Sequence, residues 1–189
     1  MEALLVSTGI VALAEIGDKT QLLSLVLATR FRRPIPIVLG ILAATLFNHA
    51  LAAAAGNWAQ AALGAFVLRW ILGLSFLAMA IWALVPDAPQ EANVEPGRFG
   101  VFGTTLISFF LVEMGDKTQV ATLALAAQHA AFTSVVIGTT AGMMLANVPV
   151  VLLGERIARR LPMRAIRAIA AAVFAVLGAA VLLELRGAG

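Results

Sequence analysis

Long apolar stretches separated by short polar segments dominate the chain. The stretches run to roughly 20 residues, the length that an α-helix needs to cross the hydrocarbon core of a bilayer. The pattern predicts six helices, with approximate ranges 3–29, 35–56, 64–85, 101–127, 133–154 and 165–185. The stretches are rich in alanine and leucine and show no strict alternation, which argues against an outer-membrane barrel. We therefore expect an all-α polytopic membrane protein.

Composition favours a membrane protein over a soluble domain. Hydrophobic residues make up 61% of the chain and charged residues 12%, and the mean hydropathy is +0.98. So little polar surface could not cover a soluble fold. Cysteine is absent, which excludes disulfides, thiolate metal sites and cysteine nucleophiles. The arginines gather near the ends of the predicted helices, so we interpret them as topology signals and not as a nucleic-acid binding patch.

One polar segment occurs twice, each time inside a long apolar stretch. Residues 15–21 read Glu-Ile-Gly-Asp-Lys-Thr-Gln and residues 113–119 read Glu-Met-Gly-Asp-Lys-Thr-Gln, so six of the seven positions are identical. The same offset of 98 aligns Gly40 with Gly138, Gly56 with Gly154, Arg69 with Arg167 and Phe76 with Phe174. We interpret the chain as a duplicated three-helix unit, 1–85 and 101–189, joined by a proline-containing acidic linker over 86–100.

An odd number of spans in each unit gives the second unit the opposite orientation in the membrane. The segments 30–34 and 155–164 carry three and four arginines, whereas their counterparts 128–132 and 57–63 carry none. The positive-inside rule places both arginine-bearing links and the linker between the units in the cytoplasm, with both termini outside. The N-terminal stretch has no Lys or Arg before its apolar run and is expected to be the first span, not a cleaved signal peptide.

Charged residues in the middle of a span need a compensating role, because Asp or Lys there costs about 2.5–3.5 kcal/mol on insertion scales. On a continuous helix Glu15, Asp18 and Lys19 share one face, and the equivalent residues of the second motif do the same. Gly17 lets the backbone bend or another helix approach closely; if the helix unwinds there, the helical spacing no longer applies. Inverted symmetry would bring the two acidic faces together as one midplane cluster of four carboxylates.

Such a cluster suits a hard divalent cation, because carboxylate, amide and hydroxyl oxygens bind Ca²⁺, Mg²⁺ or Mn²⁺. The candidate ligands are Glu15, Asp18, Glu113, Asp116, Thr20, Thr118, Gln21, Gln119, Asn48 and Asn147. His49 aligns with Asn147 at the same offset, and an imidazole ligand would shift the preference towards Mn²⁺ and away from Ca²⁺. Crowded carboxylates repel one another, so some are expected to hold protons until a cation displaces them.

Several roles of the motif residues stay open at the level of the sequence. Lys19 and Lys117 could pair with carboxylates or act as built-in cations that compete with the metal, and we prefer the pairing. The carboxylates could form structural salt bridges alone, but stability is a poor reason to bury so much charge. On an ideal helix Gln21 and Gln119 point away from the acidic face, and His49 could be a packing histidine.

The duplicated Glu-x-Gly-Asp-Lys-Thr motif, within two three-span halves, resembles the Gdt-type cation/proton exchanger family, which is grouped with the lysine-exporter superfamily. The resemblance covers nearly the whole chain. It implies that the acidic motif residues form the cation site and that Mn²⁺ or Ca²⁺ moves against H⁺, as a transported substrate and not as a cofactor. The chain lacks the N-terminal extension of organellar members and looks like the compact prokaryotic form, for which manganese export across the cell (inner) membrane is expected.

Competing functions are an amino-acid exporter of the lysine type, a passive divalent cation channel and a membrane scaffold without transport. An enzyme is not expected, because there is no nucleophile–base arrangement and no cofactor loop. The expected partners are the cation, protons and the lipid bilayer, with no nucleic acid. The sequence leaves open whether the chain forms a homo-oligomer.

Overall fold

The computed structural model describes residues 1–85, 98–129, 131–154 and 162–187, with side chains as far as residue 183 in the last segment. These residues form only α-helices. The helices are α1 (Glu2–Glu15), α2 (Lys19–Phe31), α3 (Pro34–Ala62), α4 (Ala65–Leu84), α5 (Gly100–Glu113), α6 (Lys117–His129), α7 (Phe132–Leu153) and α9 (Met163–Gly187). Most of the predicted linker 86–100 and of the link 155–164 lies outside the described residues.

Four helices are long and apolar enough to cross a membrane. They are α3, α4, α7 and the segment Met163–Leu183 of α9. Their positions match the predicted helices 35–56, 64–85, 133–154 and 165–185, although α3 continues to Ala62. The chain is therefore an integral membrane protein, with an all-helical fold over the described residues.

The two helices that carry the motif are broken, and the prediction of continuous helices over 3–29 and 101–127 is wrong in this respect. α1 ends at Glu15 and α2 begins at Lys19, while α5 ends at Glu113 and α6 begins at Lys117. Gly17 and Gly115 have φ angles of +86° and +76°, in the region that is costly for any residue with a Cβ atom. Each half-helix is about 20 Å long, which is too short to cross about 30 Å of hydrocarbon alone.

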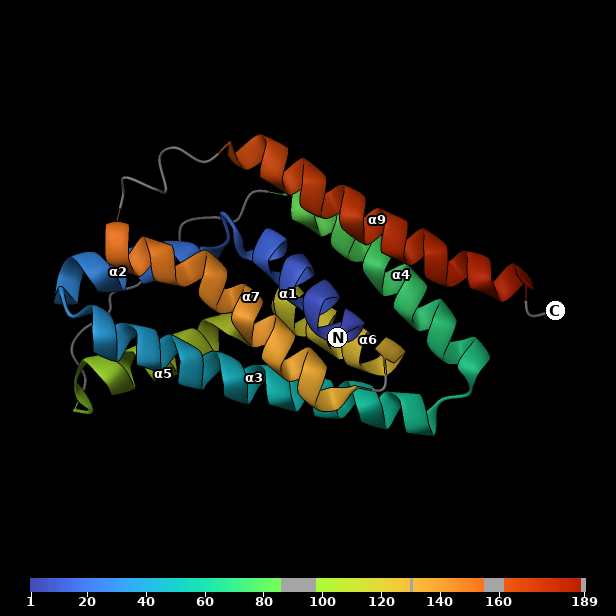
Figure 1. Ribbon diagram of the computed structural model, residues 1–189, viewed down its shortest axis with the longest axis horizontal. Coiled ribbons are helices and arrows are strands. Elements are labelled where there is room, and N and C mark those ends of the chain that lie inside the picture. The colour runs from blue at the N-terminus through green and yellow to red at the C-terminus, as the bar shows by residue number, and fades with distance from the viewer. Residues whose placement is uncertain (86–97, 130, 155–161, 188–189) are drawn as a thin grey trace.

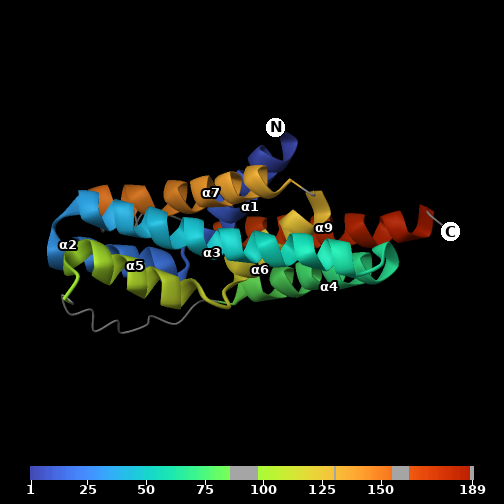
Figure 2. The same ribbon diagram turned by 90° about the horizontal axis from the view of Figure 1, so that it is seen from below.

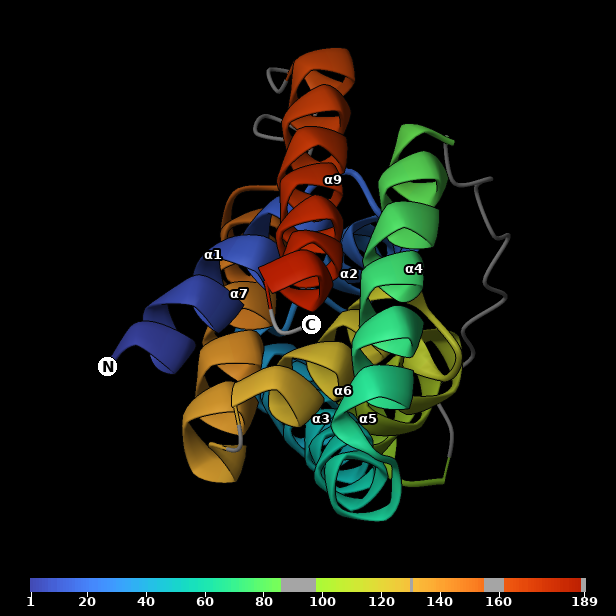
Figure 3. The ribbon, with the colours of Figure 1, turned by 90° about the vertical axis from the view of Figure 1, so that its right-hand side faces the viewer.

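The helices form an elongated bundle in which α3 runs along most of the length (Figures 1 and 2). α3 packs against α5, α6 and α7, α1 packs against α7, and α4 and α9 form an antiparallel pair along one side. The end-on view shows this pair standing beside the other helices (Figure 3). The unbroken helix α3 of the first half therefore packs against the broken helix α5–α6 of the second half, and α7 of the second half packs against the broken helix α1–α2 of the first.

Glycines at equivalent positions allow this packing. A Cβ atom on Gly40 of α3 would lie 2.9 Å from the Phe102 carbonyl oxygen of α5, and one on Gly138 of α7 would lie 2.6 Å from the Leu4 carbonyl oxygen of α1. Small residues that bring backbones this close are typical of helix packing in membranes. The aligned pair Gly40 and Gly138 thus makes the corresponding contact in each half.

Polar residues lie inside the bundle and large apolar residues lie on its surface. Buried polar side chains come from every broken helix and from α3 and α7, and include Ser7, Thr20, Ser24, Thr45, Asn48, Thr105, Thr118, Thr122, Thr139 and Asn147. Exposed large side chains include Leu39, Phe47, Leu51, Trp58, Phe66, Leu74, Ile81, Leu111, Leu145 and Val176. This distribution suits an apolar solvent outside and a hydrogen-bonded, ion-accessible interior.

Replacing Gly115 by alanine is expected to destabilise the protein by about 1–2 kcal/mol, the cost of a left-handed conformation for an L-residue with a Cβ atom. No heavy atom lies within 4 Å of the added Cβ, so the expected loss of stability comes from the backbone conformation alone and not from a steric clash. Gly9, inside α1, also has no atom within 4 Å of an added Cβ, and Gly9→Ala should instead stabilise the helix by about 0.5–1 kcal/mol. Thermal unfolding followed by circular dichroism would reveal the opposite signs; equal shifts would contradict the strained glycine.

Candidate cation site

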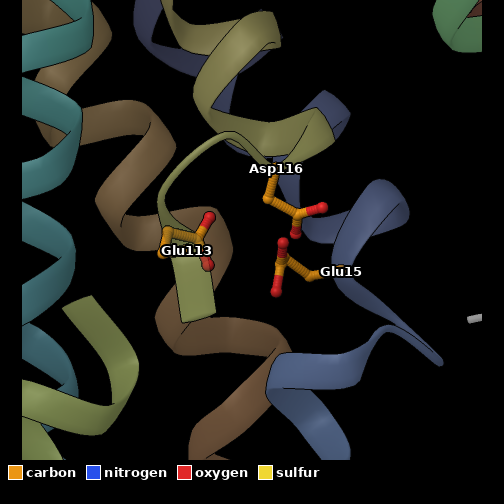
Figure 4. A group of neighbouring side chains, drawn as sticks. All are labelled: Glu15, Glu113 and Asp116. Atoms are coloured by element: carbon orange, nitrogen blue, oxygen red, sulfur yellow. The ribbon is translucent and has the colours of Figure 1, made fainter. Parts of the chain in front are cut away.

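Three carboxylates from the two helix breaks converge inside the bundle. Glu15 is the last residue of α1, Glu113 is the last residue of α5, and Asp116 directly precedes α6. One carboxylate oxygen from each lies within 4.8 Å of the other two, and all three side chains are buried. Figure 4 shows Glu15 facing Glu113 and Asp116 across the gap between the broken helices. The two motifs therefore meet in one acidic cluster.

Asp18, the fourth predicted carboxylate, lies beside this cluster and pairs with a lysine. Its Oδ1 atom is 2.5 Å from the Lys117 Nζ atom, and its carboxyl group also interacts with that of Asp116. Lys19 makes the corresponding contact at 3.5 Å from the Asp116 Oδ1 atom. Each lysine thus pairs with the aspartate of the other motif, which confirms the preferred pairing but was not predicted to cross between the halves.

The threonines hold the glutamates. The Thr20 hydroxyl donates a hydrogen bond to Glu15 Oε2, and the Thr118 hydroxyl donates one to Glu113 Oε1. Glu15 Oε1 and Glu113 Oε2 are buried and accept no hydrogen bond from the described residues, whereas Asp116 already contacts Lys19 and Asp18. Buried acceptors without donors are costly, and a cation is the partner that would satisfy them together. The predicted threonine ligands therefore orient the carboxylates.

The glutamines close the helix breaks. Gln21 Oε1 accepts a hydrogen bond from the Gly17 backbone amide at 2.9 Å, and Gln119 Oε1 accepts one from the Gly115 amide at 2.7 Å. The Gln21 amide group also donates to the Ala146 carbonyl oxygen of α7 at 3.1 Å. These contacts satisfy backbone groups freed by the break, so both glutamines cap the helix breaks; the predicted ligand role stays a prediction.

The two predicted asparagines differ in their surroundings. Asn147 accepts a hydrogen bond from Ser24 at 2.7 Å and donates one to the Met143 carbonyl oxygen at 3.1 Å, so its amide is already satisfied. Asn48 donates to the Phe110 carbonyl oxygen at 3.1 Å, while its Oδ1 atom accepts no hydrogen bond within the described chain. Of the two amide oxygens, that of Asn48 is the one without a hydrogen bond among the described residues.

Comparison with known proteins gives the family. The family described as "Divalent cation/proton antiporter GDT1" matches residues 3–91 and 101–188, which is nearly the whole chain. The chain belongs to the GDT1 family. The family is one of transporters, in agreement with the resemblance found in the sequence and with the acidic cluster at the motifs.

Relatives of the chain include a bacterial protein and two plant proteins. A protein of Vibrio cholerae serotype O1 named "Putative manganese exporter" is 50% identical over 181 residues, covering 95% of this chain and 90% of the relative. The "GDT1-like protein 3" of Oryza sativa subsp. indica and that of subsp. japonica are each 26% identical over 200 residues, covering 92% of this chain and 71% of the relative. No solved structure matches the chain.

Two contributors to the site were missed at the level of the sequence. Ser24 of α2 fixes Asn147 across the bundle, and Arg167 of α9 lines a cavity of about 10 Å³ together with Gly17, Asp18 and Lys117. A cavity of this size admits about one water molecule. The alignment of Arg69 with Arg167 was the available signal for the arginine, whereas a lone serine in an apolar stretch gives none.

Proposed function

We propose that this GDT1 protein exports Mn²⁺ from the cytoplasm in exchange for protons, using Glu15, Glu113 and Asp116 as cation ligands. The observation that carries the proposal is the convergence of these three buried carboxylates, within 4.8 Å of one another, from both motifs. Asn48 is a further candidate ligand, because its Oδ1 atom accepts no hydrogen bond from the described residues. Asp18, Thr20, Thr118 and the glutamines support the ligands.

The proposed topology has six spans in two inverted repeats. The broken helices α1–α2 and α5–α6 would each cross the membrane once, and α3, α4, α7 and α9 supply the other four spans. The arginine-rich link at 30–34 and its arginine-free counterpart at 128–132 support opposite orientations. The reciprocal packing of α3 on α5 and of α7 on α1 also supports this symmetry. The linker 86–100 would then be cytoplasmic and both termini outside the cell (inner) membrane.

The charges of the cluster match an exchange of one divalent cation for protons. Glu15, Asp18, Glu113 and Asp116 contribute four negative charges and the two motif lysines contribute two positive charges, so two negative charges remain when all six groups are ionised. A divalent cation neutralises these two charges, and two protons do the same. One site that holds either ligand, exposed alternately to each side, is sufficient for coupled exchange.

One observation favours manganese as the substrate: the 50% identical Vibrio cholerae relative carries the name of a manganese exporter. The oxygen-rich cluster disfavours soft metals, but it does not distinguish Mn²⁺ from Mg²⁺ and Ca²⁺, which share the preference for carboxylates. Lysine-type amino-acid export has weaker support, because Lys19 and Lys117 already pair with aspartates and are not available for a substrate carboxylate.

Transport by the purified protein in liposomes tests the proposal. Vesicles with an acidic lumen should accumulate Mn²⁺ as protons leave, and a protonophore that collapses the pH gradient should stop the accumulation. Protein-free liposomes are the control, and added Ca²⁺ or lysine tests the alternative substrates. Mn²⁺ flux that is independent of the pH gradient would indicate a channel. Flux of lysine without any flux of Mn²⁺ would indicate an amino-acid exporter.

A further inference from the structure

His49 of α3 lies beside the acidic cluster without a hydrogen-bond partner. The side chain is fully buried, its Nε2 atom is 3.9 Å from Glu113 Oε1, and neither ring nitrogen makes a hydrogen bond to any described residue. A buried imidazole normally has at least one of its nitrogens satisfied. The position of His49 therefore calls for a partner that the described residues do not provide.

The residue at the equivalent position of the second half has its hydrogen bonds satisfied within the protein. Asn147 stands at this position in α7, where Ser24 donates to it and it donates to Met143. Thr122 takes the place of Ser24 in the second half, but its hydroxyl donates to the Thr118 carbonyl oxygen. The hydrogen bonds that hold Asn147 thus have no counterpart at His49, and the repeat symmetry of the site is broken here.

We propose that His49 supplies a nitrogen ligand to the transported cation and thereby makes the site prefer Mn²⁺ to Ca²⁺ and Mg²⁺. This inference rests on the proposed function, because it assigns a further ligand to the same site. Imidazole is a good ligand for transition metals, whereas Ca²⁺ and Mg²⁺ take almost only oxygen ligands. Three carboxylates alone would discriminate poorly among these three cations, so one nitrogen donor supplies the missing preference.

The geometry limits where the cation sits. Two atoms bound to one small cation at about 2.1 Å lie no more than about 4.2 Å apart, and the 3.9 Å between His49 Nε2 and Glu113 Oε1 is within this limit. His49 is not part of the set of atoms that all lie within 4.8 Å of one another. A cation held by His49 and Glu113 would therefore leave at least one of Glu15 and Asp116 out of direct contact in the present arrangement, and a small side-chain movement would bring all four groups to it.

The alternative role for His49 is a charged partner of Glu113. A protonated imidazole donates from both nitrogens and cannot bind a metal, so the two roles are mutually exclusive for a bound cation. A purely structural histidine would affect the folding of the bundle and the transport of every cation alike. Nitrogen coordination, in contrast, leaves a direct spectroscopic signature and changes Mn²⁺ and Ca²⁺ transport differently.

Pulsed electron paramagnetic resonance on the Mn²⁺-loaded, full-length protein tests the ligand directly. The chain has two histidines, so labelling histidine with ¹⁵N should convert ¹⁴N modulation of the Mn²⁺ signal into ¹⁵N modulation without any substitution. His49→Gln should remove the signal. His129→Gln is the matched control, because His129 lies at the end of α6 and contacts the Leu125 carbonyl oxygen, and it should leave the signal intact. Absence of histidine nitrogen coupling in the unsubstituted protein would overturn the inference.

Transport selectivity provides the second readout. His49→Asn, which copies the residue at the equivalent position of the second half, should raise the KM for Mn²⁺ by at least about 10-fold while the KM for Ca²⁺ changes little. An unchanged ratio of Mn²⁺ to Ca²⁺ transport would overturn the role in selectivity. If Glu113→Gln abolishes transport and the His49 variants keep their selectivity, only this inference fails; if Glu113→Gln transports normally, the proposed site itself fails.

Discussion

Replacing Glu15 or Glu113 by glutamine is expected to reduce proton-coupled Mn²⁺ flux by at least about 100-fold, since even indirect partners of a metal contribute 10–100-fold. Each substitution removes one negative charge and one ligand oxygen from the cluster of three carboxylates. It preserves the size of the side chain and its contact with Thr20 or Thr118. Uptake of Mn²⁺ into liposomes with an acidic lumen measures the loss of transport.

Glu2→Gln is the matched control for this prediction. Glu2 is on the same helix as Glu15, but it is exposed in the first turn and far from the break. The same substitution there should leave transport unchanged. Full Mn²⁺ flux in both Glu15→Gln and Glu113→Gln would remove the carboxylates from the mechanism and with them the proposed site.

Replacing Lys117 by methionine is expected to have the largest effect on stability. Lys117 and Asp18 are 2.5 Å apart with side-chain exposures of 6% and 0%. Removing one partner of a buried ion pair costs about 3–5 kcal/mol, because the other charge stays buried without compensation. In a chain of this length each kcal/mol lowers the unfolding midpoint by about 2–4 °C, so a decrease on the order of 10 °C is expected in circular dichroism.

Lys19→Met provides the control at the equivalent position. Lys19 is 22% exposed and lies 3.5 Å from Asp116, and a partly solvated pair contributes only about 0–1 kcal/mol. The double variant Asp18→Asn with Lys117→Met should recover part of the stability, because no unpaired charge remains. Equal destabilisation by the two lysine substitutions, or no recovery in the double variant, would contradict the buried pair.

The helical architecture could be predicted because apolar length is a strong signal. The ranges 64–85 and 133–154 agree with α4 and α7 to within a residue or two. The breaks were left open, because a glycine at position 17 is compatible with either a continuous or an unwound helix. Gly17 followed by Asp18, a favoured residue at the start of a helix, was a local signal for two half-helices that the surrounding hydrophobicity concealed.

The acidic residues of the site could also be predicted, because charge at membrane depth is rarely accidental. The contacts between the halves could not, since the pairing of Lys117 with Asp18 depends on how two broken helices cross. The hydrogen bonds from Gly17 and Gly115 to the glutamines could not be predicted either, because they exist only once the helix is broken. Composition and spacing carry no information on hydrogen bonds that form only at a helix break.

The pairing of each motif lysine with the aspartate of the other half has a consequence for the evolution of the duplicated gene. A change at Asp18 in one copy removes the ion pair of the buried Lys117 in the other copy, and a change at Asp116 removes that of the partly exposed Lys19. Natural selection therefore acts on the two copies jointly, and a mutation in one is tolerated only with a compensating change in the other. This mutual dependence gives a structural reason for the presence of aspartate and lysine at the same positions of both motif segments.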